Sequence, residues 1–200
     1  MTGIQALERL FPAKPGKPKQ VEKIEFEYER HGTLSLIANW DVARGKVLTP
    51  SIGATRTEQD FYEHIQKTIQ TDEKGSWIFI VDQLNTHKSE SLVNLVASNC
   101  GITTDLGVKG KEGILKSMTS REAFLSDESH RIRFVYIPKH TLGLNQIECW
   151  FSILVRRLLK RSSFCSTEDL EQKILNFIDY FNWHFAKPFV WKFEGFKDHD

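Results

Sequence analysis

The chain contains one short run in which every residue is apolar, from Trp77 to Val81. Its β-branched and aromatic side chains predict a strand that is buried on both faces. The segment Arg131 to Ile137 predicts a second strand, and Pro138 and Gly143 then indicate a loop. Two short strands separated by helical patterns favour an α/β fold.

Three longer segments have the apolar spacing of amphipathic helices, with one stripe of side chains directed inward. The first extends from Glu58 to about Gln70, and Thr57 is placed to cap it. The second extends from Ser89 to Cys100, and the third from Thr167 to Phe185. For the apolar stripe of the third helix, core packing is favoured over an aromatic pocket for a nucleic-acid base.

The segment before the first helix predicts antiparallel strands. Val21 to Arg30 alternates apolar and charged residues, as an exposed strand does. We expect a turn at Gly32, then a buried strand from Thr33 to Trp40. Arg44-Gly45 suits a hairpin turn before a further strand that starts at Lys46.

Composition fits one globular domain and does not identify its partners. The chain has 200 residues, 40% of them hydrophobic, and 27 basic against 26 acidic residues give a net charge of +1. Net charge therefore does not indicate DNA binding, and any DNA-binding surface must arise from local clustering. Three scattered cysteines, with neither a signal peptide nor a membrane-spanning run, predict a soluble protein in the reduced cytoplasm.

Two acidic residues are the main candidates for chemistry. Asp82 follows the apolar strand, and ligands in open α/β sheets gather at the carboxyl ends of strands. Glu148 opens the amphipathic helix after the loop at Gly143. Each also has a structural interpretation: Asp82 as the cap of a turn, and Glu148 as the partner of Asn145 in a capping box.

Three motifs resemble one known family. They are Val-Asp-Gln-Leu-Asn-Thr-His-Lys at 81–88, Tyr-Ile-Pro-Lys-His at 136–140 and Leu-Asn-Gln-Ile-Glu-Cys-Trp-Phe at 144–151. Together they resemble insertion-sequence transposases of the mariner-like branch of the DDE superfamily, over nearly the whole chain. The resemblance implies a ribonuclease-H-like mixed sheet flanked by helices, with Asp82 as the second and Glu148 as the third acid of a catalytic triad.

In such a family two divalent ions, Mg²⁺ or Mn²⁺, activate a water or a 3′ hydroxyl, and several carboxylates must converge on them. The resemblance places the first Asp just upstream of the segment matched by Thr2 to Arg9, so we expect residues 1–10 to be the remnant of a truncated central strand. Glu8, Glu25 and Asp41 do not match the motif position. Two carboxylates supply only two negative charges for two divalent cations, so we expect the chain to be inactive. Because the central strand is shortened, we also expect the fold to be marginally stable.

The resemblance also implies a domain plan and partners. We expect one catalytic domain over 1–200, with an insertion at 101–130, a C-terminal helix and aromatic tail at 166–200, and no helix-turn-helix region. The implied partners are DNA, as element ends and target, and further copies of the chain in a homo-oligomer. We expect a pocket lined by Asn85 and His87, although such residues are also often simply solvated. The candidates for DNA contact are Lys139, His140, Asn145, Arg156, Arg157 and Lys160.

Basic side chains at the end of a helix also serve solubility and offset the helix dipole, and this alternative stays open. At the level of function, the favoured prediction is a metal-dependent transposase catalytic domain. It would become active when upstream sequence supplies the missing acid, or else be a decayed remnant. The alternatives are a non-catalytic DNA-binding or dimerising regulator and, less favoured, an unrelated metal nuclease.

Overall fold

The computed structural model of the chain describes residues 2–10, 27–138 and 146–188. Its strands are β1 (Thr2–Arg9), β2 (Tyr28–Asp41), β3 (Lys46–Gly53), β4 (Trp77–Val81) and β5 (Ile132–Tyr136). Its α-helices are α1 (Glu58–Ile69), α2 (Glu90–Cys100), α3 (Met118–Leu125), α4 (Gln146–Leu154) and α5 (Thr167–His184). Short 3₁₀ turns form η1 (Asn85–Lys88) and η2 (Ile114–Lys116), and a π-helical turn, η3 (Val155–Leu159), continues α4.

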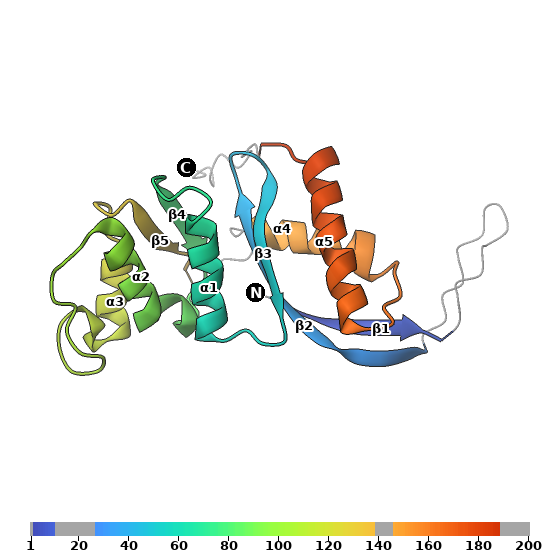
Figure 1. Cartoon of the computed structure of the whole chain (residues 1–200), viewed down its shortest axis with the longest axis horizontal. Coiled ribbons are helices and arrows are strands. Elements are labelled where there is room, and N and C mark those ends of the chain that lie inside the picture. The colour runs from blue at the N-terminus through green and yellow to red at the C-terminus, as the bar shows by residue number, and fades with distance from the viewer. Residues whose placement is uncertain (1, 11–26, 139–145, 189–200) are drawn as a thin grey trace, which may run out of the picture.

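The strands form two sheets. An antiparallel sheet has the order β1-β2-β3, and a parallel pair joins β4 to β5 (Figure 1). The predicted α/β fold with helices flanking the strands is confirmed. In the described part of the chain the two sheets are separate, and β1, which the sequence analysis interpreted as the remnant of a truncated central strand, lies at the edge of its sheet.

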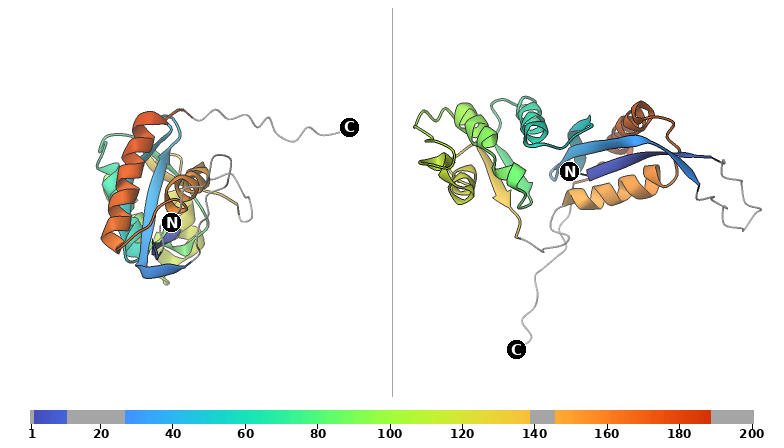
Figure 2. Two further views of the ribbon diagram at one scale, coloured as in Figure 1. Left: turned by 90° about the vertical axis from the view of Figure 1, so that its right-hand side faces the viewer. Right: turned by 90° about the horizontal axis from the view of Figure 1, so that it is seen from below.

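Each sheet has its own hydrophobic core. The helices α1, α2 and α3 pack with β4 and β5, and α4 and α5 pack on the sheet of β1, β2 and β3 (Figure 2). Strand β2 contributes to both cores, because Ile37 belongs to the first and Leu36 to the second. The cores therefore meet along β2.

The predicted turn at Gly32 is wrong. Strand β2 runs through this position, and the irregularity is a bulge: Ala6 pairs with Gly32 and Leu7 with Arg30, which leaves His31 as an extra residue. Gly32 has a φ of 126°, which only glycine adopts readily, so it accommodates the bulge without ending the strand. The predicted exposed strand begins at residues 21–26, which lie outside the described part of the chain.

The prediction that Trp77 to Val81 is buried on both faces is also wrong. Phe79 and Val81 are 8% exposed, but Ile78 is 57% and Ile80 52% exposed. Side chains alternate between the faces of a strand, and the described helices cover only the face with Phe79 and Val81. The strand itself is confirmed, with Asp82 immediately after it.

Helices with strong local signals agree with the predictions. Thr57 caps α1 and forms a capping box with Asp60, and Phe61 on this helix is buried. In α5 the apolar stripe packs into the second core, as predicted.

The segment 101–130 contains a helix that the sequence analysis did not predict, α3, whose Leu125 is fully buried. None of the described helices has the length and apolarity needed to cross a membrane.

A buried histidine gives the fold a measurable pH dependence. His64 on α1 is 1% exposed, and one ring nitrogen, Nδ1, lies 2.9 Å from Ser51 Oγ. Burial, and then the charge of Lys67, lowers the pKa of His64 to about 3. Between pH 6.5 and about pH 3, His64 is protonated in the unfolded chain but not in the folded one. The free energy of unfolding therefore decreases as the pH falls through this range.

We expect the free energy of unfolding to drop by roughly 2 kcal/mol between pH 6.5 and pH 5 through this residue alone. Urea denaturation at the two pH values measures the drop. His64→Gln, which can still bond to Ser51, should remove most of the slope. An equal slope in that variant would assign the effect to other groups.

Candidate active site

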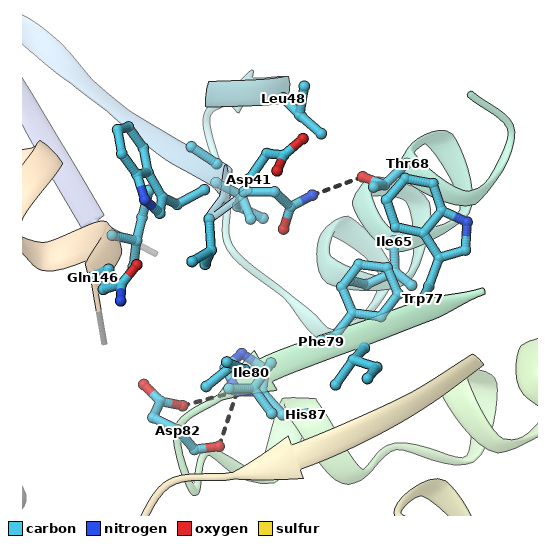
Figure 3. A pocket seen from close by; sticks show the side chains of 18 of the residues that line it. Asp41, Leu48, Ile65, Thr68, Trp77, Phe79, Ile80, Asp82, His87 and Gln146 are labelled. Carbon is cyan, nitrogen blue, oxygen red and sulfur yellow. Dashed lines mark hydrogen bonds and ion pairs between the residues drawn. The ribbon is translucent and has the colours of Figure 1, made fainter. Parts of the chain in front are cut away.

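A cavity of about 390 Å³ lies between the end of β2 and strand β4 (Figure 3). Its walls come from β2 and the turn after it, α1, β4 and the first residues of α4. The cavity therefore touches both halves of the fold. Its polar lining includes Asp41, Asp82, His87 and Gln146.

Asp82 is placed in this cavity by the end of β4. Its side chain is 55% exposed, and Oδ1 lies 2.8 Å from His87 Nδ1 and accepts a hydrogen bond from the Leu84 N–H at 3.2 Å. The hydrogen bond with His87 is the main cause that lowers the pKa of Asp82. Asp82 is therefore a carboxylate at neutral pH, with surface left to bind a ligand.

His87 orients Asp82 from a buried position. It is 5% exposed, and its ring centroid lies 4.1 Å from that of Phe61. Its Nδ1 faces two acceptors, the carboxylate and the main-chain oxygen of Asp82, so this nitrogen carries the proton. His87 lines the cavity.

Side chains distant in sequence hold the loop between Asp82 and α2. The Tyr136 hydroxyl donates to the main-chain oxygen of His87 at 2.7 Å. Lys88, 8% exposed, donates to Gln83 at 2.5 Å and to Glu122 at 2.6 Å. The sequence analysis did not identify this ion pair, because nothing local connects Lys88 to Glu122 on α3.

Glu148 lies in the first turn of α4 and is exposed. Its neighbours Gln146 and Ile147 line the cavity that contains Asp82, but Glu148 itself does not. Trp150, 1% exposed, anchors this turn in the second core. The structure thus brings the start of α4 to the cavity of Asp82 and leaves the carboxylate of Glu148 in solvent.

Asp41 is a further acid in the cavity, although it does not match the motif that the sequence analysis used. Its side chain is 13% exposed, and its two oxygens accept bonds from the N–H and the guanidinium of Arg44, both at 3.0 Å. Figure 3 shows it on the wall opposite Asp82. Asp41 lies in the cavity because the end of β2 is close to β4 in the folded chain, and the sequence alone does not show this proximity.

The other predicted residues that the structure describes do not line the cavity. Asn85 is exposed on η1. Arg156 and Arg157 are exposed on η3, with the Arg157 guanidinium 4.7 Å from the ring centre of Phe185, and Lys160 is exposed at the end of this turn. The remaining three candidates for DNA contact lie outside the described part of the chain: Lys139, His140 and Asn145.

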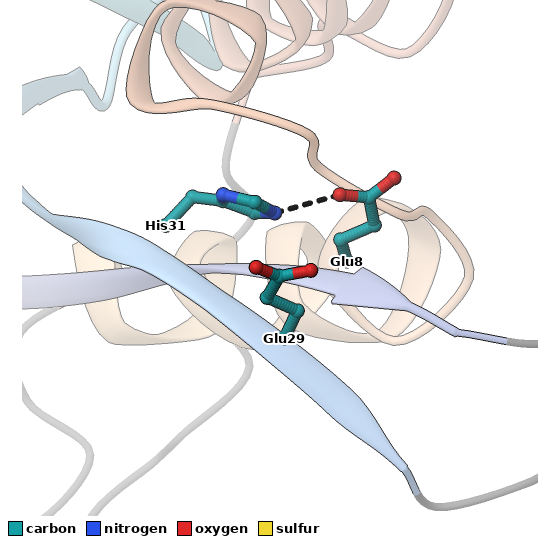
Figure 4. Close-up of side chains that lie close together, drawn as sticks. All are labelled: Glu8, Glu29 and His31. Atoms are coloured by element: carbon teal, nitrogen blue, oxygen red, sulfur yellow. Dashed lines mark hydrogen bonds and ion pairs between the residues drawn. The ribbon is translucent and has the colours of Figure 1, made fainter.

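A second cluster of possible metal ligands was not found from the sequence. Glu8, Glu29 and His31 present ligand atoms that all lie within 4.8 Å of one another, as no other three such residues do in the described ranges (Figure 4). His31 Nε2 lies 2.6 Å from Glu8 Oε2. The bulge in β2 and the pairing of Glu8 with Glu29 create this cluster, which is separate from the cavity of Asp82.

The profile of a protein family described as "DDE superfamily endonuclease" matches residues 3–171, which includes both Asp82 and Glu148. No curated protein and no solved structure shows significant similarity to the chain.

Proposed function

Because the chain belongs to the DDE superfamily endonucleases, we propose that it is a transposase catalytic domain of the mariner-like branch, which cleaves DNA and transfers the cut strand. Endonucleases of this superfamily generally use divalent metal ions. The observation that carries the proposal is the charged carboxylate of Asp82 in a cavity that the start of α4 also lines.

Asp82 and Glu148 are the proposed metal ligands. Hard carboxylate oxygens suit Mg²⁺ or Mn²⁺, and both side chains have exposed surface for an ion. Bound ions would supply charge stabilisation for the attacking and leaving oxygens of a phosphodiester. His87 keeps the Asp82 carboxylate oriented and ionised, and Trp150 fixes the turn that bears Glu148.

We propose that DNA binds along the exposed basic side chains that follow α4. Arg156, Arg157 and Lys160 follow Glu148 along α4 and η3, and we propose that they contact phosphates. Lys139, His140 and Asn145 precede α4 in sequence and are proposed to contact the strand that is cut. Such contacts give an affinity that depends on salt and hardly on sequence.

Affinity cleavage with iron tests the metal site without requiring catalysis. Fe²⁺ bound in a Mg²⁺ site produces hydroxyl radicals that cut the polypeptide close to its ligands. With ascorbate and peroxide, we expect cuts near Asp82 and near Glu148, both suppressed by Mn²⁺. Cuts confined to the neighbourhood of Glu8, Glu29 and His31 would refute the proposed site and assign metal binding to the second cluster.

We propose that two carboxylates hold the ions incompletely, so that this chain alone is a poor nuclease. Only Asp82 and Glu148 match acids of the motif, and both oxygens of Asp41 are bonded to Arg44. A non-catalytic DNA-binding regulator is the second candidate function. We propose a cytoplasmic location and homo-oligomers for either function.

Nicking and binding assays on the same DNA distinguish the two functions. Slow nicking of supercoiled DNA that requires Mn²⁺ supports the nuclease. Salt-dependent binding without nicking, even at high protein concentration and long incubation, supports the regulator. Absence of both binding and nicking near physiological salt would reject both functions.

A further inference from the structure

Aromatic side chains are exposed on the C-terminal half of α5. Trp183 is 85% exposed and Tyr180 is 52% exposed, and because they are three residues apart they lie side by side on one face of the helix. Phe185, directly after the helix, is 38% exposed. Tryptophan is highly buried on average, and neighbouring exposed aromatic side chains are typical of an interaction site.

These side chains belong to a row of groups that begins on η3. The Arg157 guanidinium lies 4.7 Å from the ring centre of Phe185. The ring of Tyr180 lies 5.7 Å from that of Phe185 and 4.6 Å from that of His184. Within the described ranges no other ring packs on Trp183, so both faces of its indole are open. We call Arg157, Tyr180, Trp183, His184 and Phe185 the aromatic strip.

Buried rings connect the aromatic strip to the cavity that contains Asp82. Trp40 lines this cavity, and its ring centre lies 6.0 Å from that of Phe181 on α5. The ring centre of Phe181 in turn lies 6.1 Å from that of Phe185. The strip therefore begins two ring contacts away from the cavity wall, and a DNA strand held at Asp82 can reach it within a few nucleotides.

The charge around the aromatic strip favours a nucleic acid over an apolar partner. Exposed cations flank the strip, with Arg156 and Lys160 on the side of η3 and Lys187 after the end of α5. The last two turns of α5 contain one acidic residue, Asp179. Aromatic side chains among cations are the combination with which proteins bind single-stranded nucleic acids, because the rings stack on bases and the cations attract the backbone.

We propose that the aromatic strip binds unpaired bases of a DNA strand, with Tyr180 and Trp183 stacking on the bases. In a duplex the faces of the bases are covered by their neighbours, so the strip selects single-stranded or locally melted DNA. The Arg157 guanidinium packs on Phe185, and the N–H groups in its plane stay available for phosphate oxygens. The inference rests on the proposed DNA binding and adds to it the class of DNA that is bound beside the cavity.

The test compares two labelled strands of equal length and charge, oligothymidylate and a strand of abasic deoxyribose phosphates. Fluorescence anisotropy measures their affinity for the full chain, and we expect oligothymidylate to bind at least tenfold more tightly, because each stacked base adds affinity. Trp183→Ala and Tyr180→Ala should each reduce this preference about fivefold or more, whereas Trp183→Phe, which keeps a ring, should retain most of it. Tyr28→Ala is the matched control, since Tyr28 is also exposed but has no ring contact with the strip.

Tryptophan fluorescence gives a readout that a loss of folding or of charge would not reproduce. A base that stacks on Trp183 quenches the fluorescence of the indole. We expect oligothymidylate to quench the emission of the parent chain and the abasic strand to leave it nearly unchanged. Trp183→Phe should lose most of this quenching while it still binds oligothymidylate.

Three results would overturn the inference. Equal, salt-dependent affinity of the parent chain for the two strands would overturn it and leave the proposed DNA binding intact. Binding to neither strand nor to duplex DNA would overturn the proposed DNA binding together with this inference. Self-association that is lost in Trp183→Ala, without any preference for the strand that has bases, would identify the strip as a contact between copies of the chain.

Discussion

Replacing Asp82 by Asn is expected to weaken the binding of Mn²⁺ at least tenfold, about 1.4 kcal/mol. The amide keeps the size of the side chain but removes the negative charge that His87 now stabilises. Any Mn²⁺-dependent nicking by the chain should fall further, roughly a thousandfold, since bound ions stabilise charge in the transition state by several kcal/mol. Electron paramagnetic resonance of Mn²⁺ measures the affinity, and supercoiled plasmid measures the nicking.

Asp127→Asn is the matched control. Asp127 is another acid whose pKa is lowered by hydrogen bonds, in this case to Ser129, but it lies in the turn after α3 and does not line the cavity. We expect this control to bind Mn²⁺ as the parent chain does. Unchanged binding in Asp82→Asn, together with loss in Glu8→Gln, would place the ion at the second cluster instead.

Trp150→Ala is expected to lower the free energy of unfolding by about 3–5 kcal/mol. Trp150 is 1% exposed and packs against Phe151 and Phe181, with ring centroids 5.4 and 6.4 Å away. Its removal leaves a cavity in the second core, at the turn that positions Glu148. Chemical denaturation measures the loss, and we expect metal-dependent activity to fall even at temperatures where the variant remains folded.

Trp150→Phe separates packing from hydrogen bonding at the same position. In the described part of the chain the indole N–H of Trp150 is buried without a hydrogen-bond partner, so phenylalanine loses volume but also removes an unpaired donor. We expect this variant to lose less than about 1.5 kcal/mol. An equal loss in both variants would show that an interaction of the N–H, and not the volume of the ring, stabilises the turn.

The parts of the fold that the sequence predicted correctly depend on local rules. The capping box of Thr57 and Asp60 sets the start of α1 within four residues of sequence, and the apolar run from Trp77 sets β4. The same local pattern predicted the position of Asp82 at the end of β4, because Asp82 directly follows that run. Residues whose position follows from a neighbouring element in the sequence were therefore predictable.

The remaining features arise from contacts between distant segments. The bulge at His31 depends on how β2 pairs with β1, so the sequence of β2 alone indicated a turn. Asp41 enters the cavity because β2 extends toward β4, and Lys88 is held by Glu122 on another helix. The exposure of Ile80 could not be predicted either. An apolar strand sequence does not indicate which of its two faces is covered by helices.

Because the fold has two cores, the distance between the two acids depends on how one core lies against the other. Asp82 follows Val81, which belongs to the first core, and Glu148 precedes Trp150, which belongs to the second. Residues of β2 belong to both cores, so a change in how one core packs against the other would move the two carboxylates relative to each other. The spacing of the two proposed metal ligands therefore depends on the contacts between the two cores as well as on the packing within each.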